Sequence, residues 1–122
     1  MSIHESGELY LETIHVLLQK NSAVRSIDIS EHMGYSKPSV SRAVNLLKKN
    51  GYLIMEDNGA LHLTEEGRAI GEKIYTRHKV LTSLLLRLGV DAKTAAEDAC
   101  KMEHAISDVT FDAIQKHLGQ FK

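Results

Sequence analysis

The chain has 122 residues, of which 43% are hydrophobic and 25% charged, as expected for one or two small folded units. Four Tyr, two Phe and no Trp are too few aromatic rings for a surface that stacks single-stranded bases. The apolar stretch 80–88 is interrupted by polar residues, which excludes a membrane-spanning helix. Cys100 is the one cysteine, and residues 1–6 lack the pattern of a secretion signal, so we expect a cytoplasmic location.

Charge is distributed unevenly along the chain, although the net charge is only −1. A total this low is unusual for a DNA-binding protein. Residues 32–55 contain no Asp or Glu, but they include Lys37, Arg42, Lys48 and Lys49. The acidic residues gather toward the two ends of the chain, at Glu5, Glu8, Glu12, Asp91, Glu97, Asp98, Glu103, Asp108 and Asp112. This segregation predicts one basic face and one separate acidic site.

Three helices are expected in the first half of the chain. Apolar residues at helical spacing predict the first helix over residues 5–20. A second helix is expected over 26–33, with Ser26 as its N-cap and Gly34 in the turn that follows. Ser36 is expected to cap a third helix that continues to about Asn50.

The hydrophobic period then changes to that of strands. Residues 52–55 and 60–64 are short strand candidates, and the segment 56–59 between them contains an Asn-Gly turn pattern. Helix, helix–turn–helix and β-hairpin in this order are typical of a winged helix-turn-helix. We therefore expect residues 1–70 to form a DNA-binding domain with a two-stranded wing.

The second half reads as entirely helical, so the fold class is mainly α. A long helix is expected over 64–88, and Asp91 is expected to cap a helix that carries Cys100, Glu103 and His104. Ser107 is expected to cap the last helix. Residues 71–122 would therefore form a separate helical domain.

The third helix has the composition of a helix that reads the major groove of duplex DNA. Arg42 has the geometry for a bidentate contact to guanine, and Asn45 for one to adenine. Pro38 can pack on a thymine methyl group, while the lysines and the wing around Asn58 would lie nearer phosphate. The candidate DNA-binding residues are Ser36, Lys37, Pro38, Ser39, Ser41, Arg42, Asn45, Lys48 and Lys49. The alternative is an ordinary solvated helix face.

A second group of residues has metal-ligand chemistry. Cys100, Glu103 and His104 follow a spacing of i, i+3 and i+4, which brings a thiolate, a carboxylate and an imidazole to one helix face. Further ligands would come from Glu12 in the first helix, with Glu8 one turn before it, and from His78 in the long helix.

Each of these residues also has a plainer interpretation. A single cysteine on a helix is often a small buried hydrophobic residue. A Glu-His pair is often exposed, and His78 lies between Arg77 and Lys79, so it could also be exposed.

Five segments in order resemble the diphtheria-toxin-repressor/manganese-transport-regulator family of iron- and manganese-dependent repressors. The resemblance extends over nearly the whole chain and rests on Glu8-Leu9-Tyr10-Leu11-Glu12-Thr13-Ile14, Ser36-Lys37-Pro38-Ser39-Val40-Ser41-Arg42, Gly59-Ala60-Leu61-His62-Leu63-Thr64-Glu65-Glu66-Gly67, Arg77-His78 and Cys100-Lys101-Met102-Glu103-His104-Ala105-Ile106-Ser107.

The resemblance implies a homodimer that pairs through its C-terminal helices and binds a pseudo-palindromic DNA operator. It also implies a metal site between these helices and the DNA-binding domain, with Fe(II) or Mn(II) as the activating ion. Co(II), Ni(II) or Zn(II) can substitute. The implied ligands are Glu12, His78, Cys100, Glu103 and His104. Cysteine at position 100 resembles the iron-responsive branch, since the manganese branch has a carboxylate there.

The chain departs from the family pattern at three ligand positions. Leu9 stands where the family has a first-helix ligand, so water, Glu8 or His4 would replace that ligand, or it would be absent. Thr82 and Ala96 stand where the iron branch has ligands of its ancillary site, which argues against a second site of that kind. The chain also ends at residue 122, without the SH3-like domain of longer members.

The sequence thus predicts a metal-responsive transcriptional repressor that controls metal-ion homeostasis. One alternative is a metal-independent winged-helix regulator that responds to a small molecule or to the redox state of Cys100. Another is a protein-interaction module that uses the same fold without DNA. An enzyme is not expected, because Cys100 and His104 have no visible oxyanion donor or third orienting group.

Overall fold

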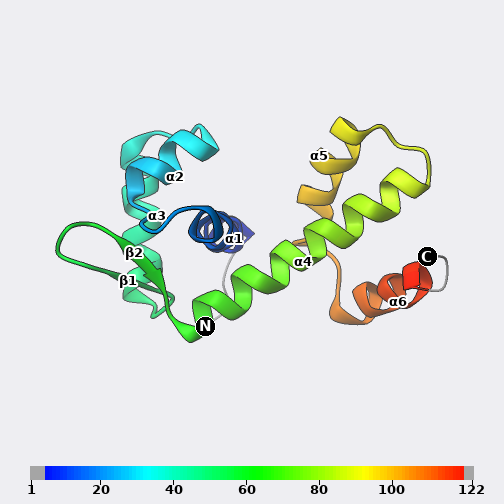
Figure 1. Ribbon diagram of the computed structural model, residues 1–122. Coiled ribbons are helices and arrows are strands. Elements are labelled where there is room, and N and C mark those ends of the chain that lie inside the picture. The colour runs from blue at the N-terminus through cyan, green and yellow to red at the C-terminus, as the bar shows by residue number, and fades with distance from the viewer. Residues whose placement is uncertain (1–4, 120–122) are drawn as a thin grey trace. The chain divides into compact units, whose positions relative to one another are not determined.

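The computed structural model describes residues 5–119 and divides the chain into two compact units, unit 1 (Met1–Lys73) and unit 2 (Ile74–Lys122) (Figure 1). The mainly helical fold is confirmed: the described residues form six α-helices and one two-stranded sheet. No helix within residues 5–119 is both long enough and apolar enough to cross a membrane.

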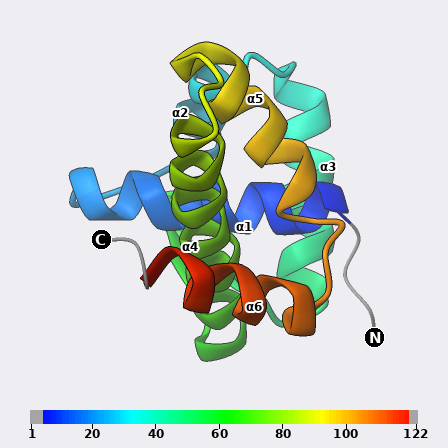
Figure 2. The same ribbon diagram turned by 90° about the vertical axis from the view of Figure 1, so that its right-hand side faces the viewer.

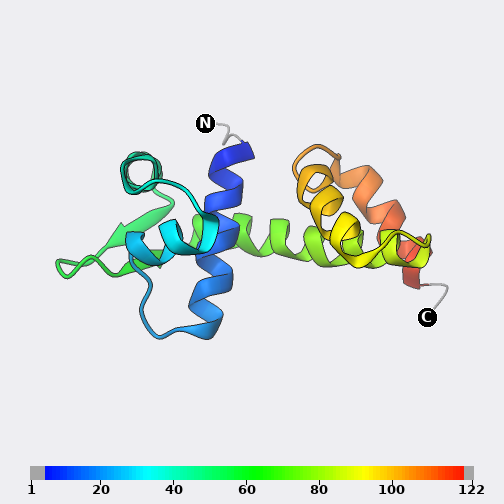
Figure 3. The ribbon, with the colours of Figure 1, turned by 90° about the horizontal axis from the view of Figure 1, so that it is seen from above.

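Three helices form the body of unit 1: α1 (Glu5–Lys20), α2 (Ser26–Met33) and α3 (Lys37–Lys49). Figure 3 shows α3 nearly end-on with α2 lying across it, as in a helix-turn-helix. The apolar stripes predicted from the sequence meet in one core, whose most buried side chains include Leu11, Ile14, Ile29, Val40 and Val44.

Local sequence determines the turn between α2 and α3. Gly34 ends α2 with a φ of 73°, a conformation that glycine adopts without the steric cost of a side chain. Ser36 caps α3 as predicted, because its Oγ accepts the backbone N–H of Ser39 at 3.3 Å. Pro38 lies in the first turn, where a missing N–H costs little. The recognition-helix candidate therefore begins at a well-defined residue.

The cap predicted at Ser26 is wrong by one residue. Arg25 is the N-cap of α2, and the Asp28 carboxylate accepts its backbone N–H at 2.8 Å. The side chain of Arg25 also donates from Nε to the carbonyl of Asn58, at the tip of the wing, at 3.0 Å. One residue thus starts α2 and holds the wing turn beside it.

The wing is a hairpin of β1 (Leu53–Met55) and β2 (Leu61–Leu63), which pair antiparallel as predicted but are shorter than expected (Figure 1). Gly59 turns the chain between them with a φ of 88°. The backbone N–H of Leu61 donates to the carbonyl of Val24 at 2.8 Å. Strand β2 is therefore attached to the segment before α2 as well as to β1.

Thr64 joins the wing to α4 (Glu65–Arg87). Its Oγ1 donates to the carbonyl of Gly51 at 2.7 Å and accepts the backbone N–H of Gly67 at 3.1 Å. Gly67 packs against the backbone of Tyr52 so closely that a Cβ there would lie 2.1 Å from the Tyr52 carbonyl oxygen. Thr64 and Gly67 therefore fix the start of α4 against the segment that follows α3.

Unit 2 consists of the C-terminal part of α4 together with α5 (Ala92–Met102) and α6 (Asp108–Gly119) (Figure 2). Asp91 caps α5 as predicted, and the hydrogen bonds from Thr94 hold the pKa of its carboxyl group below the usual value. Ser107 caps α6 through the backbone N–H three residues later, at 3.2 Å. The buried apolar residues of unit 2 are Ile74, Leu81, Ala95, Ala99 and Phe111.

Replacing Gly67 with alanine is expected to destabilise the protein strongly. The added methyl group would overlap a backbone carbonyl that cannot move without displacing the wing, at a cost of about 3 kcal/mol or more. Gly119→Ala is the matched control, because a Cβ at that helical glycine meets nothing within 4 Å. Denaturant unfolding measures both; equal stability of the two variants would contradict this packing.

Candidate metal centre and nucleic-acid interface

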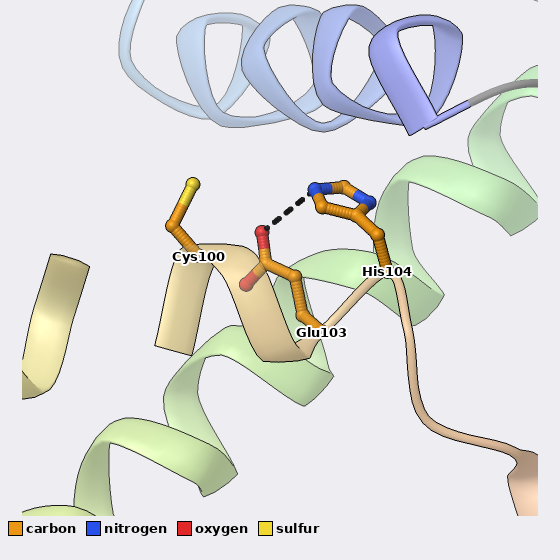
Figure 4. Close-up of side chains that lie close together, drawn as sticks. All are labelled: Cys100, Glu103 and His104. Carbon is orange, nitrogen blue, oxygen red and sulfur yellow. Dashed lines mark ion pairs between the residues drawn. The ribbon is translucent and has the colours of Figure 1, made fainter. Parts of the chain in front are cut away.

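Cys100, Glu103 and His104 lie together at the end of α5. The prediction that one helix carries all three is wrong in part, because α5 ends at Met102, Glu103 is its C-cap, and His104 lies in the turn that follows. The backbone N–H of Glu103 still reaches the carbonyl of Ala99 at 2.9 Å, which keeps the side chain on the helical face. One donor atom from each of the three side chains lies within 4.8 Å of the others (Figure 4).

The Glu103 carboxylate is the centre of this cluster. Its residue is 0% exposed, and the side chain of His104 beside it is only 2% exposed. Its Oε1 lies 3.4 Å from Nε2 of His104 (Figure 4), and its Oε2 lies 2.9 Å from Nδ1 of His78 on α4. Because a buried carboxylate is costly without polar neighbours, the hydrogen bond with His78 and the nearby imidazole of His104 both favour its position.

His78 is therefore more than an exposed side chain between two basic residues. It is 30% exposed and makes the hydrogen bond to Glu103 from the middle of α4. Within unit 2, the structure thus brings together four of the predicted ligands: His78, Cys100, Glu103 and His104.

The donors of this cluster suit a divalent transition-metal ion. Thiolate, carboxylate and imidazole are the ligands such ions prefer in proteins. Metal–ligand bonds of about 2.0–2.3 Å place two donors of one ion roughly 3–4.5 Å apart. The 4.8 Å spread of Cys100, Glu103 and His104 is close to this separation, so small side-chain rotations would suffice to bind an ion.

The three positions that depart from the family pattern supply no metal donor of this kind. The hydroxyl of Thr82 donates to the carbonyl of His78 at 2.7 Å and so belongs to the hydrogen bonding of α4. Leu9 on α1 and Ala96 on α5 are both half-buried and apolar.

The remaining candidates belong to unit 1. Glu12 is buried on α1, and Glu8 is half-buried one turn before it. His4 lies outside the described residues. A role of Glu12, Glu8 or His4 as a ligand stays a prediction.

Arg77 is the residue of this region whose role the sequence did not reveal. It is buried, and its Nη1 donates to the carbonyls of Glu103 at 3.1 Å and Ile106 at 2.7 Å. Its Nη2 donates to the Asp108 carboxylate, and its guanidinium lies 5.3 Å from the centre of the Phe111 ring. The one sequence clue was its place in the Arg77-His78 motif, where only the histidine suggested chemistry.

All the predicted DNA-binding residues belong to α3 or to its cap, and most face solvent. Val40, Val44 and Leu47 are buried on the opposite face of the helix. Ser39 is half-buried, and the exposed residues are Ser36, Lys37, Pro38, Ser41, Arg42, Asn45, Lys48 and Lys49. Unit 1 therefore presents a basic, polar helix face without a carboxylate in α3.

Arg42 lies on this exposed face of α3. Its Nη2 donates to Oγ of Ser39 at 3.5 Å, a long contact. Burial raises the pKa of Tyr10, the neighbouring Tyr35 adds to the rise, and the positive charge of Arg42 opposes it. Because the pKa of Tyr10 is raised, its phenol stays neutral at neutral pH.

Two further features next to α3 were missed from the sequence. Ser26 and Ile27, at the start of α2, line a shallow pocket of about 350 Å³ with Lys37 and Ser41 of α3. In the wing, Nε2 of His62 lies 2.8 Å from the Glu56 carboxylate, so an acidic group is paired within the hairpin.

Comparison with protein families assigns both halves of the chain. The description "Iron dependent repressor, N-terminal DNA binding domain" applies to residues 2–61. The description "Iron dependent repressor, metal binding and dimerisation domain" applies to residues 64–122. Together the two matches span almost the whole sequence.

Curated relatives agree with this assignment. The chain is 32% identical over 120 residues to an uncharacterised HTH-type transcriptional regulator of Methanocaldococcus jannaschii, covering 97% of this chain and 96% of the relative. It is 35% identical over 109 residues to the HTH-type transcriptional regulator MntR of Bacillus subtilis, covering 89% of this chain and 77% of MntR.

Solved structures share the fold. The manganese regulator SloR superposes with a TM-score of 0.83 at 27% identity, over 98% of this chain and 55% of SloR. A manganese-dependent transcriptional repressor in complex with manganese gives a TM-score of 0.81 at 28% identity, over 93% of this chain and 52% of that structure. The chain thus spans about half the length of these two proteins. These matches confirm the resemblance read from the sequence: the chain belongs to the iron-dependent repressor family of metal-dependent transcriptional regulators.

Proposed function

We propose that this protein is a transcriptional repressor of metal-ion homeostasis that binds operator DNA when Fe(II) or Mn(II) occupies the cluster around Glu103. The observation that carries the proposal is the group of thiol, carboxylate and imidazole donors within 4.8 Å of one another in unit 2. Family membership supplies the second support, because the residues of this cluster lie in the half of the chain that matches a metal-binding and dimerisation domain.

We assign Cys100, Glu103, His104 and His78 as the ligands of unit 2, with Glu12 as a ligand from α1. The contacts of Glu103 support the first four, and family resemblance supports Glu12. Glu8 or His4 would complete the set where Leu9 offers no donor. The bound ion would supply the positive charge that neutralises the Glu103 carboxylate and the Cys100 thiolate.

The thiol group of Cys100 favours iron over manganese. Thiolate is a soft ligand that prefers Fe(II), Co(II), Ni(II) or Zn(II), whereas Mn(II) prefers oxygen donors. Cys100 is half-buried at the end of α5, with its sulfur within reach of the same ion as Glu103. Two of the solved structures that share the fold, SloR and the repressor in complex with manganese, are manganese regulators by name. Fe(II) and Mn(II) therefore both have support, and the cysteine makes Fe(II) the better chemical match.

The DNA contacts of the proposed repressor come from unit 1. Arg42 and Asn45 would contact base edges, because arginine and asparagine make bidentate contacts to bases. Lys48 and Lys49 would contact phosphates, because lysine acts as a point charge. Their exposure on one face of α3 supports this assignment. The other proposed contacts are Ser36, Lys37, Pro38, Ser39 and Ser41.

The proposed repressor is a homodimer that binds a pseudo-palindromic operator. Three large apolar side chains of unit 2 are exposed: Leu86 in the last turn of α4 at 47%, Leu88 directly after α4 at 70%, and Val109 at the start of α6 at 80%. Large apolar side chains are commonly covered in an oligomer. They belong to the half of the chain whose family description includes dimerisation. Each recognition helix of the dimer would then read one half-site.

Metal binding should increase DNA affinity, because the ion and the operator would favour the same arrangement of the dimer. Coupling of about 1–3 kcal/mol corresponds to an increase of about 5- to 150-fold in affinity. The test uses metal-free protein and a duplex selected from a random pool, with Fe(II), Mn(II) or Co(II) added one at a time under anaerobic conditions. Glu103→Gln should remove this increase in DNA affinity. Glu97→Gln is the matched control: Glu97 is an exposed acidic residue of α5, so its substitution should leave the increase unchanged.

Three outcomes would contradict the proposal. DNA affinity that does not change between chelator and any of the three ions would exclude a metal-activated repressor. A response that Glu103→Gln retains but Cys100→Ser abolishes would instead favour the redox alternative. A lack of salt dependence in DNA binding would favour a protein-interaction module, since phosphate contacts release counterions.

The ion preference should change with the side chain at position 100. Replacing the thiol with a carboxylate in Cys100→Asp is expected to weaken Co(II) binding relative to Mn(II), because oxygen donors suit Mn(II) better than sulfur does. Competition titrations of the two ions measure the ratio, and Cys100→Ala controls for loss of the side chain. An unchanged ratio in Cys100→Asp would mean that the sulfur does not bind the ion.

Substitutions on α3 should separate base reading from phosphate binding. Arg42→Ala is expected to cost about 1–3 kcal/mol on the selected duplex and to relax its base preference at one position. Lys49→Ala should weaken binding to every duplex and lower the salt slope by about one. Titrations at several salt concentrations on matched and altered duplexes measure both effects. Identical behaviour of the two variants would refute the assigned roles.

A further inference from the structure

Arg77 is a buried cation that bonds to the backbone on both sides of the metal-ligand turn. Its Nη1 donates to the carbonyl of Glu103 at 3.1 Å and to the carbonyl of Ile106 at 2.7 Å. His104 lies between these two residues in the sequence. Arg77 therefore bonds to the turn at both of its ends. The next residue of α4, His78, bonds to the side chain of Glu103.

These contacts occur where a helix end needs them. The last carbonyls of α5 have no partner further along the helix, and a cation near a helix C-terminus is favourable. The backbone N–H groups of Ala105 and Ile106 both point to the carbonyl of Met102, at 3.0 and 3.2 Å. The turn is thus closed by its own short hydrogen bonds and by the guanidinium of Arg77.

The positive charge of Arg77 is balanced on the side away from the cluster. Its Nη2 donates to the Asp108 carboxylate at the start of α6, and its guanidinium lies over the Phe111 ring. Asp108 is 68% exposed, so the pair reaches solvent on one side. A nearby cation would repel a metal ion, and the paired Asp108 carboxylate offsets that repulsion.

Lysine is expected to make these contacts less well. An arginine spreads five N–H donors over a rigid plane, whereas a lysine concentrates its three donors on one flexible ammonium nitrogen. The two carbonyls and the carboxylate are bonded by two different nitrogens of Arg77, an arrangement that suits the planar guanidinium.

We propose that Arg77 is a positioning residue that fixes the backbone of residues 103–106 and so sets the affinity and geometry with which Glu103 and His104 bind a metal ion. This role rests on the proposed metal binding but adds a residue that touches no ion itself. Residues that hold ligands in place typically change metal affinity by about 10- to 100-fold when they are altered.

The test compares Arg77→Lys with Arg87→Lys in the full chain. Arg87 lies on the same helix and donates to the carbonyl of Leu118 at 3.2 Å, so the substitution removes a similar contact away from the cluster. Co(II) is the probe, because its absorption spectrum reports both its affinity and the number and type of its ligands. Arg77→Lys is expected to weaken Co(II) binding by about 10- to 100-fold and to alter the spectrum at saturation, while Arg87→Lys changes neither.

A second control separates positioning from general destabilisation. Leu81→Val opens a small cavity at a fully buried residue of α4 and should lower the unfolding midpoint while leaving the saturated Co(II) spectrum unchanged. Amide exchange in the metal-free protein gives an independent readout. Exchange at Ala105 and Ile106 should be faster in Arg77→Lys than in Leu81→Val.

The outcomes distinguish the positioning role from the metal site itself. If the wild-type protein does not bind Co(II), the proposed metal-dependent function is wrong, and the positioning role is wrong with it. If the wild type binds Co(II) and Arg77→Lys retains its affinity, spectrum and amide exchange, only the role of Arg77 is overturned. If Arg77→Lys lowers the unfolding midpoint but leaves the Co(II) spectrum unchanged, Arg77 has a purely structural role and the positioning role is likewise overturned.

Discussion

The cost of burying a carboxylate has to be offset by polar neighbours. In unit 2 this constraint applies to Glu103, which has no exposed surface and is surrounded by the other candidate ligands of that unit. His78 reaches it from α4, and His104 lies beside it in the turn after α5. Cys100, one turn earlier, adds a thiol to the same group. A cluster that gathers one thiol and two imidazoles around one buried carboxylate is well suited to a divalent ion and poorly suited to an ordinary core.

The long helix α4 links this cluster to the rest of unit 2 through two adjacent residues. Successive residues of a helix point about 100° apart, so Arg77 and His78 leave α4 in different directions. His78 bonds to the side chain of Glu103, and Arg77 bonds to its backbone carbonyl. The same helix begins at Glu65, directly after Thr64 and the wing, so one continuous helix carries both the last contacts of unit 1 and His78 of the candidate metal site.

Features that depend on neighbouring residues could be predicted from the sequence, whereas long-range ones could not. The Gly34 turn and the Ser36 and Asp91 caps follow from local backbone chemistry, and the structure confirms them. The cap at Ser26 failed because Asp28 bonds to Arg25 instead, a competition that propensity does not resolve. The role of Arg77 depends on carbonyls 26 and 29 residues away, which no sequence pattern near position 77 indicates.

The most direct test of the central claim is a crystal structure of the Co(II)-loaded protein with anomalous scattering recorded at the cobalt absorption edge. The account predicts an anomalous peak within bonding distance of the Cys100 sulfur, a Glu103 carboxylate oxygen and a His104 nitrogen. A peak bound elsewhere, with no ion at these three side chains, would contradict it. So would a fully loaded crystal without any peak in unit 2.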